Sequence, residues 1–146
     1  MFDATDTILA LSSGSLPAGI AVLRISGPAA LALVGRHVTR LPPPRHAGLR
    51  TIRDGDGAIV DRGLVILFPG PDSVTGEDLV ELHLHGGKAV VAACLEALTA
   101  HPGVRLAEAG EFTRRAFVNG RMDLTEAEGL ADLLAAETEL QRKLAI

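Results

Sequence analysis

The alternation of apolar and polar side chains is clearest in residues 79–85, where leucines alternate with Glu81, His83 and His85. A period of two predicts a β-strand with one buried face, so these three polar side chains should share the opposite face. A pair of glycines ends the strand, and apolar residues from 88 to 98 then recur at the spacing of an amphipathic helix. This stretch therefore predicts a strand, a tight glycine turn and a helix.

Further strands are predicted by short apolar runs that lie between turn-forming residues. They cover residues 19–25, 49–52, 59–68 and 104–107. The second and third runs are separated by Asp-Gly-Asp-Gly, which is typical of a turn, so they should form a hairpin. No long series of strand-helix-strand units is present. The pattern therefore predicts an α+β fold, with a mixed β-sheet of about five strands and helices packed on it.

Three further helices are predicted from caps and helical spacing. One covers residues 29–34, with Ser26 or Gly27 as its cap and a proline in its first turn. A second lies around residues 112–117 and stops at an Asn-Gly pair. A third begins at Thr125, where Thr-Glu-Ala-Glu fits a capping box. Its apolar pattern continues to the end of the sequence, so we expect this helix to need a partner surface.

Composition narrows the class of protein. A length of 146 residues suits one domain, or one domain with an appendage, and a hydrophobic content of 47% suffices for a core. The net charge of −4 and the mixed signs argue against a basic nucleic-acid-binding domain. The single cysteine, Cys94, lies on the inward side of a predicted helix and cannot form an intrachain disulfide. No signal peptide or apolar run of membrane length is visible, which favours a cytoplasmic protein without membrane contact.

Glu81, His83 and His85 could hold a metal ion, because a His-x-His strand places both imidazoles on one side. The alternative is an exposed polar strand face, which we favour because no second ligand cluster is apparent. A histidine could also act as an acid or base near neutral pH. No nucleophile or second catalytic group accompanies these residues, so we predict neither a metal ligand nor a catalytic residue.

The Gly-Gly-Lys sequence at residues 86–88 could receive a phosphate or carboxylate at the helix start, or could simply form a tight turn. The motif alone leaves both alternatives open. It is not a Walker A motif, G-x-x-x-x-G-K-[ST], and no such run occurs in this sequence. We therefore expect no P-loop GTPase or ATPase activity from this chain.

Arg24 ends an otherwise apolar strand, and a half-buried arginine requires a carboxylate or phosphate partner. It could pair with Glu77, Asp78 or Glu81, or it could bind an acidic ligand, and the residues alone leave these alternatives even. Three further arginines lie close together in the sequence: Arg114, Arg115 and Arg121. A solvated face is the simpler interpretation of this basic patch, and contact with a carboxylate ligand is the sharper one.

Four blocks of sequence together point to one family: residues 19–28, 75–87, 109–124 and 126–134. The second block reads TGEDLVELHLHGG and the third reads AGEFTRRAFVNGRMDL. On these blocks the chain resembles the N-terminal part of the MnmE (TrmE) family of tRNA uridine-modification GTPases. In that family the N-terminal domain precedes a helical domain that carries an inserted Ras-like GTPase domain. The resemblance implies an N-terminal domain at 1–122, a truncated first helix of the helical domain at 123–146, and no GTPase domain in this sequence.

The resemblance also implies a function. Full-length family members are cytoplasmic, use GTP with Mg²⁺ and K⁺, and act with an FAD-dependent partner protein. Together they modify carbon 5 of the wobble uridine of certain tRNAs. Their N-terminal domain is similar to aminomethyltransferase-type folate-binding domains. It forms a homodimer and binds a one-carbon tetrahydrofolate, such as 5-formyltetrahydrofolate, near the dimer interface.

Matched block by block, the family's folate contacts fall on Arg24, Glu81 and Arg121. Glu81 would accept hydrogen bonds from the pterin N–H and amino groups, and the arginines would bind the carbonyl or glutamate end. Three positions depart from the family pattern. Val74 replaces a common Tyr, Leu84 replaces a common Cys, and Arg121 replaces a common Lys.

Two other hypotheses compete with folate binding. The domain could be a dimerisation scaffold that binds no appreciable folate, which the loss of a ring at Val74 would favour. It could also be a free-standing enzyme of the aminomethyltransferase type. The unfinished last helix and the lack of an evident catalytic group count against that third hypothesis.

Overall fold

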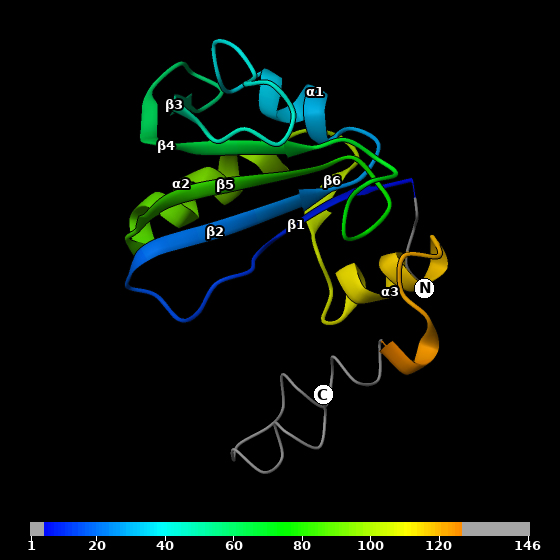
Figure 1. The fold of residues 1–146 in the computed structure, drawn as a ribbon. Helices are drawn as coiled ribbons and strands as arrows, with labels where there is room; N and C mark the ends of the chain where they lie inside the picture. Colours follow the sequence, from blue (N-terminus) through cyan, green and yellow to red (C-terminus); the bar gives the residue numbers. More distant parts are fainter. Residues whose placement is uncertain (1–4, 127–146) are drawn as a thin grey trace.

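The computed structural model describes residues 5–126, and Figure 1 shows their arrangement. The strands are β1 (Thr7–Leu11), β2 (Ala18–Ser26), β3 (Gly48–Arg53), β4 (Ile59–Phe68), β5 (Leu79–Gly86) and β6 (Val104–Leu106). The helices are α1 (Ala30–Gly35), α2 (Lys88–Thr99) and α3 (Glu111–Val118). The predicted strand, glycine turn and helix of residues 79–98 are therefore confirmed as β5 and α2.

The strands form one six-stranded sheet in the order β3-β4-β5-β2-β1-β6. Neighbouring strands are antiparallel, except that β1 and β6 are parallel. The predicted α+β fold with a mixed sheet and a β3–β4 hairpin is confirmed. The strand that the pattern did not predict is β1. It lies between β2 and β6 and is buried at Thr7, Ile8 and Leu9, so its residues show no apolar-polar alternation.

One face of the sheet carries the hydrophobic core, and α1 and α2 pack against it (Figure 1). Inward-facing positions alternate along each strand, as in Leu82 and Leu84 of β5. Helix α2 contributes Val91, Leu98 and the thiol of Cys94. Burial raises the pKa of Cys94 to about 12, so this thiol is a core residue and not a reactive group.

The glycine at the end of β5, Gly86, is required by the close approach of the neighbouring strand. Gly86 pairs with Ala18 of β2, and a Cβ on Gly86 would overlap the carbonyl oxygen of Ala18. Only glycine permits this close approach of two backbones. The turn then leads to Gly87, which is the N-cap residue of α2.

The opposite face of the sheet is open over its middle and its β3 side. The half-buried residues of this open face include Val22, Arg24, Ile66, Glu81 and His83. Three large apolar side chains on it are exposed: Ile20 by 62%, Leu49 by 55% and Leu64 by 38%. A face that combines apolar and charged side chains in this way is suited to binding.

The other end of the same face is covered by α3 and by the loop before β5. Ser26 and Leu79, at the paired ends of β2 and β5, are buried there. Figure 1 shows α3 at this end of the sheet, away from α2. Arg24 and Glu81 lie two positions from Ser26 and Leu79 along the same strands. They therefore lie where the open part of this face meets the covered part.

Two predicted caps are wrong. Helix α1 begins at Ala30, and its N-cap residue is Ala29, whose N–H donates a hydrogen bond to the hydroxyl of Thr7 at 2.9 Å. Ser26 does not cap it because its hydroxyl bonds elsewhere. Residues 124–126 are already helical, and Asp123 Oδ1 accepts from Glu126 N–H at 2.7 Å, so Asp123 and not Thr125 is the cap.

The rest of the predicted C-terminal helix, and most of the segment 123–146, lie outside the described residues. Within residues 5–126, none of the helices is long and apolar enough to span a bilayer.

Candidate functional site

Arg24 and Glu81 form a cross-strand pair at the centre of the open face. They lie directly opposite each other in the β2–β5 register, so their side chains emerge on the same side of the sheet. Arg24 Nη2 donates a hydrogen bond to Glu81 Oε2 at 3.1 Å. The two side chains are 28% and 18% exposed, so the pair is accessible from the open face.

The second oxygen of Glu81 is bound by its own strand. His83 Nε2 donates to Glu81 Oε1 at 3.0 Å. Partial burial would raise the pKa of Glu81, but the hydrogen bonds from His83 and Arg24 outweigh it and hold the pKa below its ordinary value. Glu81 is therefore a fixed carboxylate at neutral pH, and it can act only as an acceptor.

The geometry answers the question of which carboxylate Arg24 contacts. Of the three acidic residues considered, only Glu81 accepts from it, since Glu77 binds Ser26 and Arg115 while Asp78 accepts from Gly70 N–H. One donor of Arg24 is unsatisfied in this pair, because its buried Nε–H has no partner among the described residues. An unsatisfied buried donor of this kind is uncommon in folded proteins.

The histidines do not form a metal cluster with Glu81. His85 Nδ1 lies 2.9 Å from Asp61 Oδ1, at the far end of β5, while His83 contacts Glu81. Among residues 5–126, no group of three or more His, Cys, Asp or Glu side chains is arranged to hold a metal ion. The two histidines therefore belong to two separate pairs.

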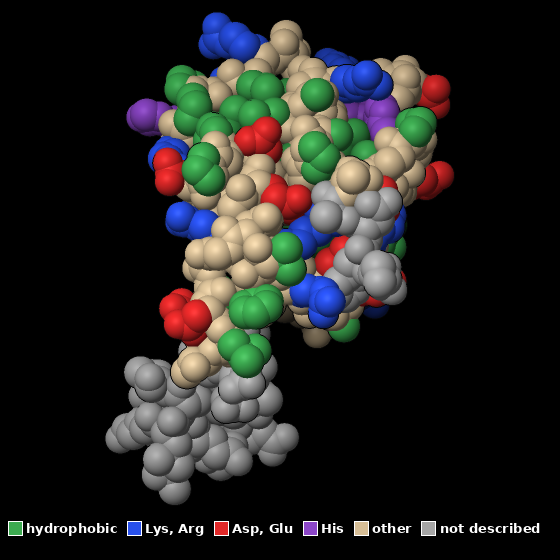
Figure 2. All heavy atoms as spheres, turned by 90° about the vertical axis from the view of Figure 1, so that its right-hand side faces the viewer, with side chains coloured by type: hydrophobic (Ala, Val, Ile, Leu, Met, Phe, Trp, Pro, Cys, Tyr) green, Lys and Arg blue, Asp and Glu red, His purple; other side chains and the backbone are tan. Residues whose placement is uncertain are grey.

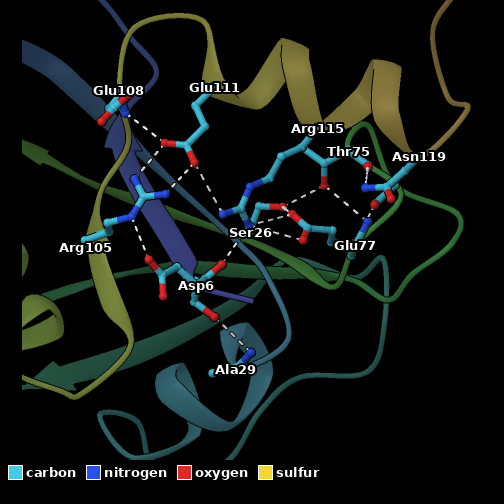
Figure 3. A network of polar contacts seen from close by, with 12 residues as sticks. Asp6, Ser26, Ala29, Thr75, Glu77, Arg105, Glu108, Glu111, Arg115 and Asn119 are labelled. Carbon is cyan, nitrogen blue, oxygen red and sulfur yellow. Dashed lines mark hydrogen bonds and ion pairs between the residues drawn. The ribbon is translucent and has the colours of Figure 1, made fainter. Parts of the chain in front are cut away.

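An ionic network that we call the α3 network meets the sheet at Ser26, two residues after Arg24 on β2. Its members are Asp6, Ser26, Thr75, Glu77, Arg105, Glu111, Arg115 and Asn119 (Figure 3). Arg115 is only 5% exposed and donates to Glu77 and Glu111 at 3.1 and 3.3 Å. Both interpretations of the basic patch are therefore wrong for Arg115, which lies inside the molecule as the counter-charge of two carboxylates.

The α3 network holds the loop at residues 73–77 against the end of the sheet. The hydroxyls of Ser26 and Thr75 are hydrogen-bonded at 2.6 Å, and Asn119 donates to the carbonyl oxygen of Thr75 at 2.9 Å. Gly76 has a φ of +80°, and a Cβ there would lie 2.8 Å from the Cβ of Asn119. Glycine is therefore required for the close approach of this loop to α3.

Arg121 contacts this same loop, since its Nε donates to the carbonyl oxygen of Ser73 at 3.0 Å. The structure thus brings Arg24 and Glu81 into direct contact and holds Arg121 on the loop that adjoins the end of β2. Two departures from the family pattern also have clear positions. Val74 is 57% exposed on that loop, whereas Leu84 is buried in the core beneath the helices.

Two hollows of the described surface lie away from the Arg24–Glu81 pair. They have volumes of about 390 and 320 Å³ and share His101, on the side of the sheet that carries the helices. His37 and His101 meet there, with their Nε2 atoms 2.8 Å apart. In the side view of Figure 2, acidic and basic side chains are interspersed over the described residues, in keeping with the mixed charge of the sequence.

The chain matches known proteins over most of its length. The family described as "GTP-binding protein TrmE N-terminus" matches residues 7–121, which include every strand and α1 to α3. The chain belongs to this TrmE N-terminal family. The predicted resemblance to this family is thereby confirmed.

Relatives within this family are close in sequence. The chain is 63% identical over 142 residues to the tRNA modification GTPase MnmE of Rhizobium meliloti. It is 62% identical to the proteins of the same name from Sinorhizobium medicae and Brucella canis. Each match covers 97% of this chain but 32% of the relative, so the chain spans about a third of the length of these TrmE relatives.

Proposed function

We propose that this chain is the tetrahydrofolate-binding and homodimerisation domain of a tRNA-modifying GTPase. The observation that carries the proposal is the Arg24–Glu81 pair on the open face, within a chain of the TrmE N-terminal family. The ligand would be 5-formyltetrahydrofolate or a related one-carbon tetrahydrofolate, which would supply the carbon that is added to the base.

The donor and acceptor set of the pair fits this ligand. Each carboxylate oxygen of Glu81 accepts one protein hydrogen bond, which leaves one further lone-pair position on each oxygen. Two adjacent acceptors match the two parallel N–H donors of a pterin ring edge. Arg24 adds a positive charge, while Val22 and Ile66 flank the pair with apolar surface.

Arg121 would complete the site from the loop side. Its guanidinium is held by Ser73 at one nitrogen and keeps other donors for a carbonyl or carboxylate of the ligand. The bound folate would thus contact two strands and the segment that follows α3. Within this chain the residues only bind and orient the ligand, and we propose no catalytic residue among them.

The larger function belongs to the full-length protein. We propose that it is cytoplasmic and uses GTP with Mg²⁺ and K⁺. We also propose that it acts with an FAD-dependent partner protein on carbon 5 of the wobble uridine of tRNA. The support for this step is family membership and the name of the relatives, tRNA modification GTPase. The chain itself carries no Walker A motif, so we expect no GTPase activity from it.

A second candidate function is a dimerisation scaffold that binds no folate. The exposed side chains of Ile20, Leu49 and Leu64 favour an interface on the open face, because a second copy of the chain would remove them from water. The exposed Val74 also offers no aromatic ring to a ligand. Homodimerisation is common to both candidates, so folate binding is what separates them.

Calorimetric titration of the chain with 5-formyltetrahydrofolate tests the proposal. We expect saturable binding, and a loss of affinity on the order of tenfold or more in Arg24→Ala, because a charged ligand contact is removed. Arg53→Ala is the matched control, since Arg53 is an exposed arginine at the hairpin end of β3.

Sedimentation of the same samples reports the oligomeric state. A folded, dimeric wild-type chain that binds no 5-formyltetrahydrofolate would refute the folate proposal and favour the scaffold.

A further inference from the structure

We infer that His83 is a positioning residue of the proposed folate site, which holds the carboxylate of Glu81 in its binding orientation through the Nε2–H···Oε1 hydrogen bond. The inference rests on the proposed function. It adds a residue that the family resemblance did not assign, and it is carried by contacts of this chain alone.

Two side chains hold the carboxylate of Glu81 by hydrogen bonds, one at each oxygen. Arg24 alone would fix one carboxylate oxygen from the neighbouring strand, and the group could still rotate about its last carbon–carbon bond. His83 fixes the other oxygen from the same strand, two residues further on. Anchors at both oxygens set the plane of the carboxylate before any ligand arrives, so less orientational freedom is lost on binding.

The hydrogen bond between His83 and Glu81 can have only one direction. Since Glu81 is ionised and only accepts, His83 must carry a proton on Nε2. The structure therefore assigns the Nε2-protonated form to His83. This assignment can be measured in the free chain without any ligand.

His85 differs from His83 in its carboxylate partner and in its exposure. Both histidines are on β5, and both contact a carboxylate, but His85 pairs with Asp61 of β4 at the end of the sheet. Its side chain is 76% exposed, against 27% for His83. His85 is therefore a matched control, because it is a histidine–carboxylate pair on the same strand without contact to Glu81.

Three variants of His83 separate positioning from simple packing. His83→Leu removes the donor, and the adjacent hollow of about 210 Å³, bordered by Ile20, Leu49 and Leu64, leaves room for the new side chain. His83→Gln places an amide N–H near the position of Nε2, whereas His83→Asn reaches only the position of Nδ1. A positioning role predicts that Gln, and not Leu or Asn, preserves binding.

The expected result is a dissociation constant for 5-formyltetrahydrofolate that rises about three- to tenfold in His83→Leu and His83→Asn, since one hydrogen bond to a charged group is lost. His83→Gln should stay within about twofold of the wild type, as should the control His85→Leu. Wild-type affinity in His83→Leu would overturn the inference and leave the proposed function intact.

A second measurement does not depend on the ligand. Imidazole ¹⁵N shifts of the free chain should report a proton on Nε2 of His83, and Glu81→Gln should change them. A His83 protonated only at Nδ1 would overturn the inference, because that form cannot donate to Oε1. Failure of the wild-type chain to bind 5-formyltetrahydrofolate would refute the proposed function and this inference together.

Discussion

Replacing Glu111 by alanine is expected to lower the free energy of unfolding by about 3–5 kcal/mol, because it breaks a buried ionic network and leaves the donors that Glu111 satisfies without their acceptor. Glu111 is fully buried and accepts from Arg105 at 2.8 and 2.7 Å, and from the backbone N–H of Glu108 at 3.0 Å. It also accepts from Arg115. Without it, the buried guanidinium of Arg115 keeps Glu77 as its remaining carboxylate partner in the α3 network.

The contribution of Glu111 to stability should depend on pH. The hydrogen bond from Arg105 is the largest influence on Glu111 and holds its pKa below the ordinary value of 4.5. A lowered pKa in the folded state means that the unfolded chain binds the proton more readily. The stabilisation from Glu111 is therefore present above about pH 4.5 and is lost as the pH falls through the folded pKa. The difference between the wild type and Glu111→Ala should shrink in that range.

Urea unfolding followed by circular dichroism measures this effect. Glu108→Ala is the matched control, three residues earlier, because the side chain of Glu108 is exposed. It should change the free energy of unfolding by no more than about 0.5 kcal/mol. A Glu111→Ala chain that is as stable as Glu108→Ala would show that the network contributes little to the fold.

Glu81→Gln is expected to weaken binding of 5-formyltetrahydrofolate on the order of 100-fold, because a half-buried acceptor for two ligand donors becomes partly a donor. The substitution keeps the size of the side chain but removes its charge. Arg24 and His83 then lose their ionic partner, so the orientation of the whole site changes. Glu81→Asp should bind with intermediate affinity, since it keeps the charge but shortens the reach.

Calorimetry with Glu96→Gln as the control tests this prediction. Glu96 is exposed on α2, on the opposite side of the sheet, and makes no contact with the open face. The control should bind as the wild type does. An affinity of Glu81→Gln equal to that of Glu96→Gln would exclude Glu81 as a ligand contact.

Local pattern was sufficient for much of the fold. The segment from Leu79 to Thr99 was predictable because a period of two changes to a helical period at a glycine pair, and each residue agrees with its neighbours. Strand β1 was not, because an interior strand that is buried on both sides has no alternation. The start of α1 was also unpredictable, since its N-cap residue Ala29 donates to the hydroxyl of Thr7, far away in sequence.

The site was only partly accessible to sequence reasoning. Glu81 and His83 could be placed on one strand face from spacing alone, but the register that sets Arg24 opposite Glu81 is a tertiary property. Arg115 was misread because it stands next to Arg114 in a helix with several charged residues. Its partners Glu77 and Asp6 lie 38 and 109 positions away, and its pair with Glu111 at i−4 has the same spacing as an exposed helix ion pair, so spacing alone does not distinguish it from a solvated arginine.

The central claim is that folate binds on the open face of the sheet, at Arg24 and Glu81. Backbone amide shifts of the ¹⁵N-labelled chain, followed during titration with 5-formyltetrahydrofolate, test it most directly. We predict saturable changes centred on residues 22–24, 81–83 and 121, with the helix side little affected. Changes centred on the hollows around His101, or no changes at saturating ligand, would contradict the claim.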